Sequence, residues 1–155
     1  MITDVRFCAR LDAEAQAKHE NPDKVAIVSI TDPGQDPALQ DWQGRILRLS
    51  FLDVIPTRGS AEDNVSQAFN EQMGHSLVQF LEQLNDSPKG LTLLVHCEFG
   101  ASRSAAVALY AEALTGADLH RRYLAFGGNL HVLSVLQKVR PLQQPVELPA
   151  GPKTA

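Results

Sequence analysis

The order of apolar and polar positions along the chain predicts four strands. Apolar runs at 25–30 and 91–96 are typical of parallel strands that are covered on both faces. Residues 2–8, with some irregularity, and residues 46–52 alternate between apolar and polar side chains, which favours strands with one buried face. Residues 31–34, Thr-Asp-Pro-Gly, predict a turn after the second strand.

Apolar residues that recur at intervals of three and four predict helices between and after these strands. The longest such pattern covers 61–84, with Ser60 as its N-cap and Asp63 in its first turn. The alanine-rich segment from Arg103 to a cap at Gly116 carries hardly any charge, so we expect this helix to be covered on nearly all sides. Shorter helices are predicted at 12–18, at 117–126 and, after an N-cap at Asn129, at 130–139.

These elements predict an α/β fold with a single domain. We expect a twisted, mainly parallel sheet of four or five strands, with helices on both faces. Residues 1–140 form the predicted domain. The chain after residue 140 is rich in proline and poor in apolar residues, so 141–155 is predicted to be an irregular docked segment or a disordered tail.

The composition of the chain is that of a soluble protein rather than a membrane protein. A chain of 155 residues with 44% hydrophobic and 21% charged residues is typical of one soluble globular domain. No apolar run approaches the roughly 20 residues of a membrane span, and the N-terminus does not resemble a secretory signal, so we expect a cytoplasmic protein. The formal charge of −4 argues against nucleic acid or an anionic membrane as a main partner. The two cysteines are too few for a disulfide framework.

The candidate chemistry lies between the strand that ends at His96 and the alanine-rich helix, in the segment CEFGASRS (97–104). A loop at the head of a helix gathers unpaired backbone N–H groups at the positive end of the helix dipole, which makes an anion site. Gly100 allows the backbone to turn inward without a side chain in the way. The order strand, loop, helix therefore predicts a cradle for a phosphate or another oxyanion.

The side chains of this loop add a nucleophile to the cradle. Cys97 opens the loop, and helix N-termini and guanidinium groups lower the pKa of a thiol from about 8.5 into the range ~3.5–7.5. Arg103 can grip two oxygens of a tetrahedral dianion at once. Ser104 can hydrogen-bond the sulfur when it leaves. A buried structural cysteine beside a surface arginine is the alternative, but it explains neither Gly100 nor the position of the loop.

The pattern His-Cys-x-x-Gly-x-x-Arg-Ser resembles the signature loop of the cysteine-dependent protein tyrosine and dual-specificity phosphatases. The resemblance is firm in the loop and looser over 25–139, where it indicates a compact, bacterial-type member. The position of Cys97 far from the N-terminus disfavours the low-molecular-weight tyrosine phosphatases and arsenate reductases.

This resemblance implies hydrolysis of phosphate monoesters through a phosphocysteine at Cys97, with no cofactor and no metal. The implied partner is a phosphorylated protein or a small phosphomonoester. His96 is expected to orient the loop rather than to transfer a proton. The phosphate is expected to bind Arg103 and the backbone N–H groups of Glu98, Phe99, Gly100, Ala101, Ser102 and Arg103.

A phosphatase of this kind also needs an acid to protonate the leaving oxygen. Asp53 and Asp63 both lie upstream of Cys97 in the expected region. Asp63 is explained as an early residue of a capped helix, whereas Asp53 follows a strand and has no such explanation. We therefore favour Asp53. The carboxyl ends of parallel strands meet at one edge of a sheet, so Asp53 is expected to lie near Cys97.

Two other functions remain open from the sequence. The first is a phosphate-binding module without turnover, in which the acid is missing or misplaced. The second is a cysteine-based sulfur-transfer or redox enzyme, although such loops do not usually require an arginine six residues after the cysteine.

Overall fold

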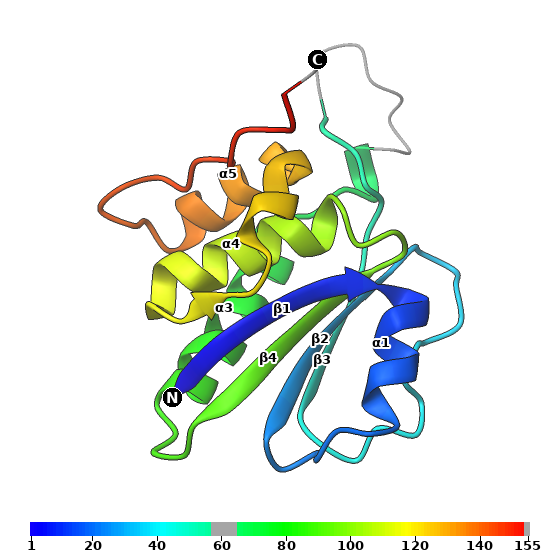
Figure 1. The fold of residues 1–155 in the computed structure, drawn as a ribbon. Coiled ribbons are helices and arrows are strands. Elements are labelled where there is room, and N and C mark those ends of the chain that lie inside the picture. The colour runs from blue at the N-terminus through cyan, green and yellow to red at the C-terminus, as the bar shows by residue number, and fades with distance from the viewer. Residues whose placement is uncertain (57–64, 154–155) are drawn as a thin grey trace.

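The computed structural model describes residues 1–56 and 65–153 and shows an α/β fold. All pairings within its five-stranded sheet are parallel, so the sheet is parallel throughout. The strand order is β3-β2-β4-β1-β5, which places β4 at the centre (Figure 1). The strands are β1 (Ile2–Ala9), β2 (Val25–Thr31), β3 (Ile46–Ser50), β4 (Leu91–Cys97) and β5 (Asp118–Leu119).

Helices cover both faces of the sheet, as predicted (Figure 1). On one face α1 (Arg10–Ala17) buries Ala13 against Ile27 and Leu94. The other face carries the larger core, to which α3 (Glu71–Asn85), α4 (Arg103–Thr115) and α5 (Leu130–Val139) all contribute. The strand-loop-helix segment that carries Cys97 therefore runs through the middle of the molecule.

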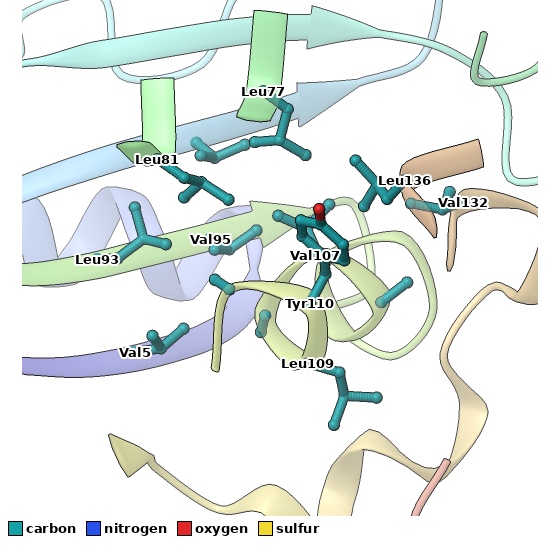
Figure 2. Close-up of a cluster of buried hydrophobic side chains, with 14 of the residues drawn as sticks. Val5, Leu77, Leu81, Leu93, Val95, Val107, Leu109, Tyr110, Val132 and Leu136 are labelled. Carbon is teal, nitrogen blue, oxygen red and sulfur yellow. The ribbon is translucent and has the colours of Figure 1, made fainter. Parts of the chain in front are cut away.

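The helix α4 is buried along most of its length, which confirms the expectation from its apolar sequence. Every residue from Arg103 to Ala111 is buried. Figure 2 shows Val107 and Tyr110 of α4 among side chains from α3, α5 and the sheet, including Leu77, Leu136 and Val95. The phenol of Tyr110 donates a hydrogen bond of 2.8 Å to the carbonyl of Arg140, so its polar atom is satisfied. This packing fixes the position of the helix that follows the loop.

The predicted helix over 61–84 is wrong in its extent. Helix α3 begins only at Glu71, after Asn70, whose side chain accepts a hydrogen bond of 2.9 Å from the backbone N–H of Met73. The carbonyls just before α3 are used by other parts of the fold: that of Gln67 accepts from Leu52 N, and that of Phe69 binds His131 Nε2. Ser60 and Asp63, assigned to the start of this helix, lie outside the described residues.

The predicted helix at 117–126 is also wrong. Gly116 has a φ of +76°, which ends α4 in a left-handed turn, and the chain then adds β5 to the edge of β1. The backbone N–H of His120 donates to Val5 O, which continues that contact. A short 3₁₀ helix, Arg122–Gly127, follows before α5. Residues 118–119 thus form backbone hydrogen bonds with the open edge of β1 instead of the helical hydrogen bonds that the local sequence pattern favours.

The chain after α5 is irregular but docked. Leu142, Val146 and Leu148 are partly buried and pack against the main core. Residues 141–153 thus contact the core without forming a helix or a strand. Across the described ranges, none of the helices combines the length and the apolar character that crossing a membrane requires.

Candidate active site

Cys97 is the last residue of β4 and lies at the carboxyl edge of the sheet, at the start of the candidate loop. Its side chain is 2% exposed and its Sγ has two polar neighbours. The hydroxyl of Ser104 lies 3.1 Å from Sγ, and the backbone N–H of Gly100 donates to Sγ over 3.3 Å. Both neighbours can donate a hydrogen bond to the sulfur.

The loop after Cys97 lies so close to β1 that one of its positions requires glycine. Gly100 has a φ of +73°, and a Cβ there would come within 2.4 Å of the backbone atoms of Ala9 and Cys8. The Arg10 N–H donates to the Glu98 carbonyl over 3.3 Å and ties the loop to the start of α1. The sequence predicted the freedom of Gly100 but not its contact with β1.

We expect Gly100→Ala to destabilise the fold strongly. The left-handed backbone alone costs about 1–3 kcal/mol for a residue other than glycine, and the contact with the β1 backbone adds to that cost. The free energy of unfolding from urea denaturation should fall by at least about 3 kcal/mol. Gly34→Ala is the control, because Gly34 has a φ of +86° with nothing within 4 Å of the added Cβ. Equal losses in the two variants would contradict the close contact.

The side chain of Arg103 is hydrogen-bonded at one nitrogen, and among the described residues another of its nitrogens has no partner. Its Nη1 donates to Asp32 Oδ1 over 2.6 Å and to the carbonyl of Phe51 over 2.8 Å. Its Cζ lies 6.0 Å from the centroid of the Phe51 ring. Arg103 is only 3% exposed, yet its buried Nε has no hydrogen-bond partner in the described part of the chain. A buried donor without a partner is costly, so this N–H points to a ligand oxygen as its natural partner.

Asp53 lies against the same loop, at Ser102. Its Oδ1 accepts hydrogen bonds of 2.8 Å from the hydroxyl of Ser102 and 2.8 Å from Nδ2 of Asn129. The side chain is exposed, so one carboxyl oxygen is held by the protein and the group stays open to solvent. Its role as the acid stays a prediction. Asp63, the other candidate, lies outside the described residues.

His96 is fully buried, and its ring contacts hold the carboxyl end of β4 in place. Its Nε2 lies 2.6 Å from Ser29 Oγ on β2, and its Nδ1 lies 3.3 Å from the carbonyl of Cys97. Burial lowers the pKa of His96 below its usual value, so the ring is neutral at physiological pH. These contacts fit the predicted orienting role.

The second cysteine, Cys8, is close to the loop along the backbone, but its side chain packs in a different core. Cys8 is free and packs with the smaller core on the α1 face, whereas Cys97 belongs to the core on the α4 face. Burial raises the pKa of Cys8 to about 12, with smaller contributions from Asp12 and Cys97. A thiol with that pKa is protonated and unreactive at neutral pH. Cys8 therefore acts as a packing residue of the smaller core.

Two residues of the site were not expected from the sequence. Asp32, assigned only to a turn, forms the ion pair with Arg103. Asn129 was expected only as a helix cap, which it is, but it also binds Asp53. Asp32 had a signal: it directly follows β2, the neighbour of β4, at the same edge of the sheet. In the described ranges, no cluster of three or more His, Cys, Asp or Glu side chains suited to a metal ion occurs.

Comparison with solved structures gives a structural likeness. No family model matches the chain, and no curated protein matches it. A solved structure described as "Crystal structure of Tk-PTP in the active form" is similar over 89% of this chain and 90% of that chain, with a TM-score of 0.48 and 16% sequence identity.

Proposed function

We propose that this protein is a cysteine-dependent phosphatase of the protein tyrosine and dual-specificity type, which hydrolyses phosphate monoesters through a phosphocysteine on Cys97. One observation carries the proposal: in one short loop, a thiol contacted by two donors occurs with a buried arginine N–H that has no protein partner among the described residues. A tetrahedral oxyanion bonded to the sulfur would accept from that N–H and from the loop backbone.

The first step transfers the phosphoryl group to sulfur. The Cys97 thiolate attacks phosphorus, and the bond from phosphorus to the ester oxygen breaks. Arg103 and the backbone N–H groups from Glu98 to Arg103 hold the three equatorial oxygens, where charge accumulates. The acid Asp53 gives its proton to the leaving oxygen, so that an alcohol or phenol departs rather than an anion.

The second step releases phosphate. A water molecule attacks phosphorus, Asp53 accepts a proton from it, and the bond from phosphorus to sulfur breaks. The hydroxyl of Ser104, 3.1 Å from Sγ, donates a hydrogen bond to the departing thiolate. Inorganic phosphate and free Cys97 remain, and the cycle needs no cofactor.

Steady turnover of p-nitrophenyl phosphate tests the proposal. A phosphatase releases nitrophenol and phosphate in equal amounts over many turnovers, and rapid acid quenching traps phosphate on Cys97, identified by mass spectrometry of the peptide. A binding module would bind phosphate without turnover. A sulfur-transfer enzyme would react with thiosulfate and leave the phosphate ester intact.

The proposed partners are phosphorylated proteins or small phosphomonoesters. The loop carries Glu98 and the 85% exposed Phe99 beside the cysteine, and no lysine. This favours substrates with a single phosphate over polyanionic head groups, which Glu98 would repel. A cytoplasmic location, and the lack of nucleic-acid and membrane partners, stay predictions.

Arg103→Lys should reduce kcat/KM for p-nitrophenyl phosphate by about 10²–10³-fold. This is the usual effect of removing one hydrogen-bond donor to the charge that develops in the transition state. Lysine has a single nitrogen, which cannot bind Asp32 and Phe51 O and also contact the phosphate. Arg48→Lys is the matched control, because Arg48 also binds two carbonyls, those of Ala38 and Leu39, outside the loop. If both variants kept normal activity, the guanidinium would have no part in the reaction.

A further inference from the structure

Asn129 connects three parts of the candidate site. Its side chain is 4% exposed, and its Oδ1 accepts a hydrogen bond of 3.0 Å from Val132 N at the start of α5. Its Nδ2 donates to Asp53 Oδ1 over 2.8 Å and to the Val54 carbonyl over 3.3 Å. Its backbone N–H donates to Ser102 O over 3.1 Å. One residue thus joins the helix, the loop after β3 and the cysteine loop.

The helix cap fixes which way the amide of Asn129 faces. The backbone N–H of Val132 can only donate, so the amide oxygen must face it and the NH₂ group must face Asp53. An NH₂ group only donates, and therefore Oδ1 of Asp53 acts as an acceptor. The Ser102 hydroxyl donates to the same oxygen. When Asp53 is protonated, its proton accordingly lies on the other oxygen, Oδ2.

We propose that Asn129 is a positioning residue for the general acid: it holds Oδ1 of Asp53 so that Oδ2 carries the proton to the leaving group. This inference rests on the proposed function, in which Asp53 is that acid. Asn129 does not touch the substrate and acts only through Asp53.

The element that carries Asn129 is rigid, whereas Asp53 lies on an exposed segment. Helix α5 buries Val132, Leu133 and Leu136 in the main core. Asp53 follows β3 and is exposed. A donor anchored in the core therefore sets the position of a carboxyl group that has little packing of its own. A displacement of about 1 Å in a reacting group can cost about 10²-fold in rate.

The Asn129→Ser variant distinguishes the proposed positioning of Asp53 from the role of Asn129 as the N-cap of α5. Serine caps a helix about as well as asparagine but is too short to donate to Asp53. We expect kcat/KM for phenyl phosphate, whose leaving group needs a proton, to fall by about 10–100-fold, a part of the ~10²–10⁴ that a positioned acid supplies. For 2,4-dinitrophenyl phosphate, whose leaving group does not, the loss should be under about threefold. Inhibition by inorganic phosphate should stay unchanged.

Asn70→Ser is the matched control, because Asn70 caps α3 in the same way, through Met73 N at 2.9 Å, and is not part of the site. It should leave both substrates unaffected. Asn129→Asp is the second variant, in case the serine variant does not fold. It has the same shape and keeps the cap acceptor but replaces the donor with an oxygen, and we expect the same selective loss.

The outcomes separate this inference from the proposed function. Equal losses for the two substrates in an Asn129 variant, or no loss for phenyl phosphate, would overturn the positioning role while wild-type turnover upheld the phosphatase. A wild-type protein that hydrolyses neither ester would overturn the phosphatase proposal and the positioning role with it.

Discussion

Cys97→Ser is expected to abolish hydrolysis of aryl phosphates and to leave oxyanion binding almost intact. Serine lacks the thiolate that attacks phosphorus, and its hydroxyl stays protonated at neutral pH, so turnover should fall to the rate of the uncatalysed reaction. Apart from the contacts of Gly100 N and Ser104 Oγ with Sγ, the cradle is held by bonds that do not involve the sulfur. Arg103 is held by Asp32 and Phe51, and the loop backbone is held by Gly100 and by the bond from Arg10 N to Glu98 O.

Turnover of p-nitrophenyl phosphate and calorimetric titration with inorganic phosphate or tungstate measure the two properties separately. Cys8→Ser is the matched control, because Cys8 packs on the other face of the sheet and its thiol is protonated. It should keep wild-type kcat/KM. A Cys97→Ser variant that still turns over substrate at a rate near wild type would show that another nucleophile acts.

The central part of the fold could be predicted because its local signals agree. The apolar run of β4, the cysteine and glycine that follow it and the alanine-rich α4 each favour the structure that forms. Asn129 also caps α5 where the sequence placed the cap. When neighbouring sequence patterns favour the same structure, the structure of a segment can be predicted from sequence alone.

The errors arise where bonds to distant residues decide the structure. The apolar pattern at 61–84 continues through Phe69, but Phe69 packs at 4.9 Å between ring centroids against Phe51, and Asn70 begins a new helix. Likewise β5 forms because the edge of β1 is open. A periodic pattern records which side chains are buried; it does not record which backbone groups find partners elsewhere.

The residues of the candidate site also fall into two groups: those that are close in sequence and those that only the fold brings together. Cys97, Arg103 and Ser104 are close in sequence, so their spacing identifies them. Asp32 and Asn129 are separated from their partners by 71 and 76 positions, and only the fold brings them together. A polar residue directly after a buried parallel strand is a usable signal, and it applies to Asp32 as well as to Asp53.

Asp53→Asn should lower kcat/KM for phenyl phosphate by about 10²–10⁴-fold, the usual contribution of a positioned acid. The change is close to isosteric, and the amide oxygen can still accept from Ser102 and Asn129, so the loop should keep its structure. What is lost is the proton for the leaving oxygen. The loss should therefore be small for 2,4-dinitrophenyl phosphate, whose leaving group is stable as an anion.

The pH profile provides an independent measurement. A general acid must be protonated to act, so in the wild type kcat/KM falls as pH rises through its titration, and this basic limb should flatten in Asp53→Asn. Asp63→Asn is the reciprocal variant, because Asp63 is the other carboxylate upstream of Cys97. Normal activity of Asp53→Asn on phenyl phosphate together with a disabled Asp63→Asn would transfer the role of acid to Asp63. The roles of Cys97 and Arg103 would stand, because neither the nucleophile nor the oxyanion cradle depends on which carboxylate supplies the proton.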